Sequence, residues 1–175
     1  MKQVSAFLFI CFMLFFVRPV QADPLQTVPY LDVEQYMGKW YEIARLPQIF
    51  QPACTATTAD YSLNDDGSVA VHNFCRILHP RFGFPISIDG RAVPEDQSNS
   101  KLSLTFFDGR TQGKYWVLEL ADDYSWSLVG DPDRSSLYLL SRAPTLSEEI
   151  KTRVLELAVQ KHGYDIDRLI FTRQP

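Results

Sequence analysis

The sequence predicts an all-β fold: an eight-stranded antiparallel up-and-down β-barrel, with one C-terminal α-helix packed on its wall and a short final strand. Short β-rich segments recur at regular spacing, turn-like sequences of hairpin length separate them, and a single capped amphipathic segment follows the eighth. A meander of this kind must bury one face, and closing into a barrel removes its exposed edges. The 175 residues fit one domain.

The first half of the chain shows a helical turn followed by strands. Asp32 is a cap for a turn over residues 31–37, with Gln35 three residues further on. Strands are expected over residues 39–46, 55–63, 68–77, 86–93, 101–107, 114–120, 125–129 and 137–141. The sequence NDDG at residues 64–67 is a strong turn signal. A turn centred on Asn64 and Asp65 places residue 54 opposite residue 75, and another turn type or a bulge shifts this by one or two.

The amphipathic segment near the C-terminus predicts a helix. Residues 145–148 form a capping box with Thr145 as the cap, and Gly163 ends the helix. Its apolar stripe consists of Ile150, Val154, Leu157 and Ala158. The polar face is mixed in charge rather than rich in lysine, which favours packing on the barrel wall over binding to a membrane. A final strand is expected over residues 168–172.

The N-terminal segment has the pattern of a secretory signal peptide over residues 1–22. Lys2 precedes an unbroken apolar run over residues 6–17, and small or apolar residues precede a cut after Ala22. The run is shorter than the ~18 residues that a membrane span needs. The bulky residues before Cys11 argue against a lipid anchor there. We therefore expect export to the periplasm, with association with the outer membrane left open.

Cleavage after Ala22 changes the charge and cysteine content of the chain. The net charge falls from −4 to −6, because the removed segment carries Lys2 and Arg18 and no acids. Two of the three cysteines remain, Cys54 and Cys75. An even pair in an oxidising compartment usually bonds, and both lie near the far ends of one hairpin. The sequence therefore predicts a disulfide between them.

The sequence offers little support for catalysis, cofactors or nucleic-acid binding. His72, His79 and His162 are widely spaced, and no metal-ligand spacing, nucleophile elbow, P-loop or dinucleotide motif occurs. We thus expect no catalytic residues, no metal and no cofactor. The acidic chain lacks a basic run, which argues against nucleic acid as a partner. An enzyme acting on a bound lipid and an interaction module with a filled barrel remain as rival hypotheses.

A ligand-binding barrel is the better supported hypothesis. An eight-stranded barrel has an interior that side chains just fill or that holds one small ligand. Aromatic residues are spread over nearly every predicted strand. Inward faces of this composition favour an acyl chain or another flat apolar molecule.

Several segments resemble the lipocalin family. Residues 38–45 read GKWYEIAR and closely resemble its G-x-W-Y-E-I-A-R signature, in the position after a short helical turn where that family has it. Residues 130–142 are similar to the segment around the last two barrel strands of its bacterial members. Residues 57–67, and the capped helix with the last strand, are further matches. Together they cover nearly all of residues 30–174, and residues 23–175 are expected to form a lipocalin domain.

The resemblance implies roles for individual residues. Trp40 would lie at the closed end of the barrel with Arg142 stacked over it, and Gly38 would give a close chain turn, so these residues form a structural floor. Strand parity and the resemblance together give the candidate ligand contacts, which are Tyr61, Phe106, Trp116, Tyr138 and Leu140. Of these, Trp116 is not supported by strand parity. Glu42 shares a face with Trp40, and a structural hydrogen-bond network is preferred for it over a ligand contact.

The resemblance also implies a cargo. Fatty acids or lysophospholipids are expected as the lipophilic ligand, with a role in storage, transport or membrane maintenance under stress. Bacterial relatives carry a lipid-modified cysteine at the mature N-terminus, whereas the expected cut here follows Ala22. Peripheral contact with a membrane, and a monomer or a homodimer, are left open.

Overall fold

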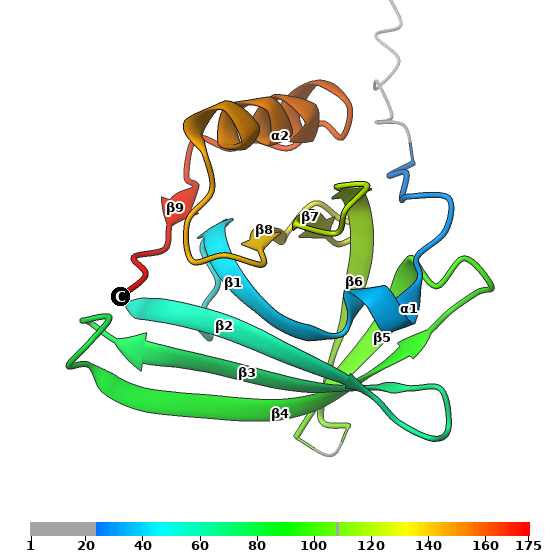
Figure 1. Cartoon of the computed structure of the whole chain (residues 1–175), viewed down its shortest axis with the longest axis horizontal. Helices are drawn as coiled ribbons and strands as arrows, with labels where there is room; N and C mark the ends of the chain where they lie inside the picture. The colour runs from blue at the N-terminus through cyan, green and yellow to red at the C-terminus, as the bar shows by residue number, and fades with distance from the viewer. Residues whose placement is uncertain (1–23, 108) are drawn as a thin grey trace, which may run out of the picture.

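Eight antiparallel strands close into a barrel in the computed structural model, which describes residues 24–107 and 109–175 (Figure 1). Each strand pairs with the next along the chain, and β1 pairs with both β8 and β2, which closes the sheet. The strands are β1 (Gly38–Arg45), β2 (Cys54–Leu63), β3 (Val69–Ile77), β4 (Phe84–Pro94), β5 (Lys101–Phe106), β6 (Thr111–Leu120), β7 (Trp126–Gly130) and β8 (Leu137–Ser141). A ninth strand, β9 (Ile170–Phe171), pairs with β1 outside the barrel. The predicted fold class is confirmed.

The N-terminal limits of the domain remain predictions. Residues 1–23, which include the expected signal peptide and Cys11, lie outside the described residues. Neither helix of the described chain has the length and apolar character needed to cross a membrane.

The short helix α1 (Val33–Tyr36) lies at one end of the barrel, on the right in Figure 1. Its N-cap is Asp32, as the sequence predicts: an Asp32 carboxylate oxygen accepts a hydrogen bond from the Gln35 backbone N–H at 3.2 Å. Gly38 follows with a φ of +91°, a conformation that glycine adopts without strain. The chain can therefore turn directly from α1 into β1.

The register of the β2–β3 hairpin differs from that of a turn centred on Asn64 and Asp65, within the shift of one or two residues that another turn type or a bulge allows. Cys54 lies opposite Ile77 rather than Cys75, a shift of two residues. The ladder is irregular between Thr55 and Thr58, where Ala56 has a φ of +49°. The two cysteines still form the expected disulfide, with their Cα atoms 5.6 Å apart, because diagonal neighbours in a hairpin lie within reach.

The helix α2 (Glu148–Gln160) packs on the outside of the barrel, as predicted (Figure 1). Val154 and Ala158 are fully buried against apolar side chains of β1, β6, β7 and β8. The predicted cap is wrong by two residues: Ser147, not Thr145, accepts the hydrogen bond from the Ile150 N–H. A serine caps as well as a threonine, so packing of the apolar stripe can fix where the helix begins.

Two apolar clusters separate the inside of the barrel from its outer wall. The outer cluster joins α2 to the wall. The inner cluster takes side chains from all eight barrel strands and from α1, which is the arrangement of a barrel interior. Its buried members are Leu31, Tyr36, Trp40, Ala59, Tyr61, Val69, Val71, Ala92, Leu102, Val117, Val129 and Leu140.

Candidate ligand-binding site

Four of the five predicted contact residues lie in the inner cluster. Tyr61 and Leu140 are buried in it, and Phe106 and Tyr138 pack against it while staying partly accessible. The Phe106 ring lies directly over Gly90 of β4, where an added β-carbon would come within 2.5 Å of the ring. Gly90 therefore makes room for an aromatic side chain on the inner wall. Whether these residues touch a ligand remains a prediction.

Trp116 does not belong to this group. It packs against the outer cluster, and its ring lies 5.0 Å from the Lys101 ammonium. Its neighbours Tyr115 and Val117 belong to the inner cluster, and alternation along β6 therefore points Trp116 outward. Trp116 is therefore not a lining residue, which corrects the prediction. The sequence alone did not reveal which face of β6 points inward, because that depends on how β6 packs against its neighbouring strands.

Strand β4 contributes lining residues that sequence reasoning missed. The β3–β4 register is unbroken from Ala92 to Phe84, so Phe84, Ile86 and Ile88 share the inner face with Ala92. Phe84 is 73% exposed and Ile86 40% exposed although they face inward. These inward-facing side chains are therefore accessible to solvent at this end. The sequence does contain a signal that predicts them, because large apolar residues alternate at Phe84, Ile86 and Ile88.

The opposite end of the barrel is closed by the predicted floor residues. Trp40 is fully buried, and the Arg142 guanidinium lies 3.8 Å from the centre of its ring. Arg142 also donates hydrogen bonds to the carbonyls of Lys39 at 3.0 Å and Gln35 at 2.8 Å. The contact therefore ties β1 and β8 to the end of α1.

A cluster of tyrosine hydroxyls lies above this floor. The Tyr36 hydroxyl lies 2.8 Å from that of Tyr115 and donates to Ser127 at 2.9 Å, and the Tyr61 hydroxyl donates to Tyr115 at 3.2 Å. Burial raises the pKa of Tyr36 to about 12 and also raises the pKa values of Tyr61 and Tyr115. The cluster therefore consists of neutral phenols in an otherwise apolar wall.

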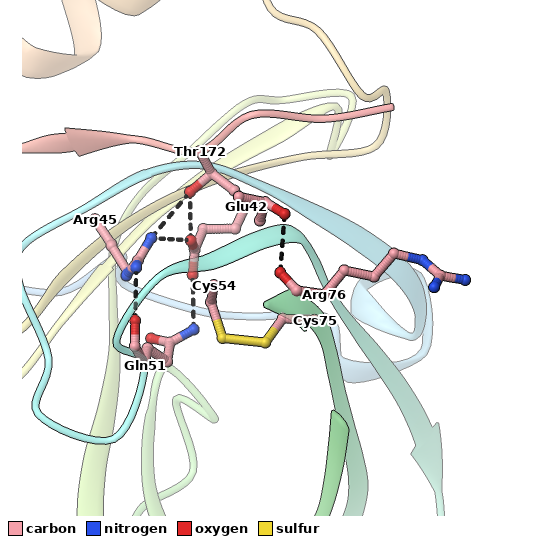
Figure 2. The surroundings of a disulfide bond; sticks show 8 residues. Glu42, Arg45, Gln51, Cys54, Cys75, Arg76 and Thr172 are labelled. Carbon is pink, nitrogen blue, oxygen red and sulfur yellow. Dashed lines mark hydrogen bonds and ion pairs between the residues drawn. A yellow bond between two sulfur atoms is a disulfide. The ribbon is translucent and has the colours of Figure 1, made fainter. Parts of the chain in front are cut away.

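Glu42 belongs to a buried network near the disulfide (Figure 2). One carboxylate oxygen accepts from Arg45 Nη1 at 2.9 Å and from the Thr172 hydroxyl, and the other accepts from Gln51 Nε2 at 3.2 Å. Arg45 Nη2 donates to the Gln51 carbonyl at 3.0 Å. Both oxygens of Glu42 have protein partners, which supports the structural role preferred for it.

Each of the three histidines has a hydrogen-bond partner within the protein. His162 is buried with its Nε2 2.7 Å from a Glu119 carboxylate oxygen, and His72 Nδ1 lies 2.6 Å from Asp89. His79 Nδ1 accepts from two backbone N–H groups of its own loop. Among the described residues, no group of three His, Cys, Asp or Glu side chains is placed to hold a metal ion.

The fold and the site define a closed β-barrel with an apolar inner cluster, floored at one end and with exposed inward-facing apolar side chains at the other: the architecture of a calyx. A family model described as a lipocalin-like domain matches residues 31–174. The chain belongs to the lipocalin family.

Two relatives agree with this assignment, and a solved structure agrees with the fold. The outer membrane lipoprotein Blc of Citrobacter freundii is 36% identical over 158 residues, covering 90% of this chain and 87% of the relative. Temperature-induced lipocalin-1 of Arabidopsis thaliana is 40% identical over 159 residues, covering 86% and 83%. The structure of insecticyanin from Manduca sexta superposes with a TM-score of 0.68 at 21% identity, covering 86% of this chain and 85% of that one.

Proposed function

We propose that this protein binds a small lipophilic molecule inside its barrel. The observation that carries the proposal is the single inner cluster, which draws on all eight strands, rests on the Trp40–Arg142 floor and reaches an exposed apolar mouth at Phe84 and Ile86. Membership of the lipocalin family supports the same function. Removing apolar surface from water would drive binding.

The proposed ligand is a fatty acid or a lysophospholipid. Each methylene of an acyl chain that enters an apolar interior gains about 0.8 kcal/mol, so a long chain can reach micromolar affinity after the cost of association. Half-buried Tyr138 offers a hydroxyl beside the apolar wall, and burial raises its pKa, which keeps it neutral. Such a group suits the polar end of a lipid.

The proposed setting is the cell envelope. The expected signal peptide would export the chain, and the bacterial relative is named an outer membrane lipoprotein. The name of the plant relative links that protein to temperature. Storage, transport or membrane maintenance under stress is the role that we propose, without a lipid anchor at Cys11.

Fatty-acid titration monitored by tryptophan fluorescence tests the function. Trp40 belongs to the inner cluster and is the expected reporter of a bound ligand. We expect a saturable change, and we expect Tyr138→Asp to weaken binding by about tenfold or more because it places a carboxylate on the apolar wall. Tyr30→Asp is the matched control, since Tyr30 is 61% exposed and lies outside the inner cluster.

Two outcomes would favour the rival functions. A lipid that is hydrolysed or isomerised during the incubation would indicate an enzyme. The absence of a saturable response to any lipid tested would indicate an interaction module with a filled barrel. Native mass spectrometry of protein purified from its own cell envelope, with lipid extraction, would identify the cargo directly.

A further inference from the structure

Large apolar side chains are exposed at the tips of three loops. Ile49 and Phe50 lie in the β1–β2 loop and are 99% and 65% exposed. Leu78 and Phe82 lie in the β3–β4 loop at 69% and 85%, and Phe107 lies in the β5–β6 loop at 60%. In an up-and-down barrel these alternate loops lie at the same end, here the end away from α1, which precedes β1. We call these five side chains the apolar rim.

Basic side chains surround the apolar rim although the chain as a whole is acidic. Arg81 and His79 belong to the β3–β4 loop, and Arg110 belongs to the β5–β6 loop. Arg173 joins them, because its guanidinium donates to the Leu78 carbonyl at 2.6 Å. In the sequence of the three loops the one acid is Asp108.

The fourth loop at the end away from α1 differs from the other three. Residues 131–136 read DPDRSS and contain no large apolar side chain. Asp131 holds this loop together by accepting hydrogen bonds from Ser135 and Ser136. The apolar rim is therefore one-sided, and an acidic loop borders it.

We propose that the apolar rim docks on an anionic lipid bilayer, with its side chains in the boundary between headgroups and acyl chains. Aromatic and aliphatic tips suit this depth, and the surrounding arginines suit the lipid phosphates. Three separate loop tips can enter between headgroups. Docking in this orientation turns the mouth at Phe84 toward the membrane and leaves the acidic loop of residues 131–136 at the margin.

A second copy of the chain fits the apolar rim less well. A two-fold contact would bring the basic patch around the apolar rim against the same patch of the partner copy. Arg81 and Arg110 would then face like charges across a desolvated contact. An anionic bilayer supplies the opposite charge, which is why we assign the surface to lipid.

Vesicle flotation tests the proposal with the purified processed protein. The vesicles are phosphatidylcholine alone, or phosphatidylcholine with about one-third phosphatidylglycerol. One variant combines Phe50→Ser, Phe82→Ser and Phe107→Ser, one change in each loop. The matched control combines Tyr30→Ser, Leu63→Ser and Val159→Ser, which replace exposed apolar side chains outside the apolar rim. The control shares the N-terminus of the rim variant, so any contribution from that segment cancels.

We expect the unaltered protein to float with the anionic vesicles and to bind neutral ones more weakly. The rim variant should lose about tenfold or more of its partition coefficient, and the control should keep it. Exchanging Arg81 and Arg110 for Glu should remove the preference for anionic vesicles. Equal binding by the rim variant, equal loss in the control, or no binding by the unaltered protein would each overturn the proposal.

Two further measurements distinguish docking on a bilayer from dimerisation and from ligand binding inside the barrel. Sedimentation equilibrium would reveal a dimer that the rim variant abolishes, and such a dimer without vesicle binding would show that the apolar rim joins two copies instead. Fatty-acid titration of the rim variant should give the same affinity as the unaltered protein, because none of its three changes lies in the inner cluster. Loss of vesicle binding with retained ligand binding therefore supports docking independently of the cargo.

Discussion

The buried hydroxyls of three tyrosines contribute to stability through their hydrogen bonds in the barrel wall: Tyr36, Tyr61 and Tyr115. Each phenol buries an aromatic ring in the inner cluster or against it, and each hydroxyl has a partner from another element. A buried hydroxyl without a partner would cost about 1–3 kcal/mol, so the hydrogen bonds fix how α1 sits on the barrel. Ionisation of any one phenol would place an uncompensated charge in this wall.

We therefore expect stability to fall at alkaline pH. The pKa of Tyr36 is raised from 10.0 to about 12, and those of Tyr61 and Tyr115 are raised as well. Because the unfolded chain ionises first, the contribution of these groups is complete below pH 10 and is lost as the pH rises through Tyr36's folded pKa. Each group lowers the free energy of unfolding by up to about 1.4 kcal/mol per pH unit in that window.

Urea unfolding at a series of pH values from 9 to 11.5, with phenolate absorbance at 295 nm, measures this loss. Absorbance from the buried phenols should grow together with unfolding rather than before it. A free energy of unfolding that stays flat above pH 10 would contradict the burial of these hydroxyls.

Among the elements, the β2–β3 hairpin departs most from the sequence prediction in its detail. Local signals identified both strands, the turn at residues 64–67 and the pairing of Cys54 with Cys75. The two-residue shift in register has two sources: the turn is longer than predicted, since Leu63 pairs with Val69, and the irregularity at Ala56 takes back one residue of that shift. The Ala56 N–H bonds to the carbonyl of Arg173. That partner lies over a hundred residues away in the sequence, so local patterning could not reveal the bulge.

Removing the disulfide should destabilise the protein by about 3 kcal/mol, because it closes a loop between cysteines 21 residues apart. We expect reduction by dithiothreitol to lower Tm by about 6–12 °C in a domain of this size. The double variant Cys54→Ala with Cys75→Ala should show the lower Tm with or without the reductant. A reduced protein with an unchanged Tm would mean that the hairpin is held by its ladder and the C-terminal segment alone.

At the scale of the whole molecule, the seam between β1 and β2 completes the barrel. These strands pair over only part of their length, from Gly38 to Tyr41 on β1. Beyond that point the C-terminal segment bridges them: the Thr172 N–H donates to the Ile43 carbonyl, and Gln174 Nε2 donates to the carbonyls of Glu42 and Thr57. Sequence patterns predicted the barrel and the family resemblance implied its floor, but a bridge between strands and a distant segment depends on tertiary contacts.

Weakening this bridge should loosen one seam without opening the rest of the barrel. Thr172→Val keeps the volume of the side chain but removes the hydroxyl that bonds to Glu42 and accepts from Arg45 Nη1. Because the lost partner is a buried charge, we expect a cost of about 1.5–3 kcal/mol in the free energy of unfolding. Thr152→Val, at an exposed position of α2, is the matched control and should cost less than about 0.5 kcal/mol.

Hydrogen exchange should locate the change. The amide of Ala56, which bonds to the Arg173 carbonyl at 2.7 Å, should exchange faster in Thr172→Val. The amides in the part of β1 that pairs with β2, from Gly38 to Tyr41, should keep their protection. Faster exchange throughout the barrel would indicate global destabilisation rather than a local seam. Unchanged exchange at Ala56, with unchanged stability, would show that the ladder of β1 with β8 holds this edge without help from the C-terminal segment.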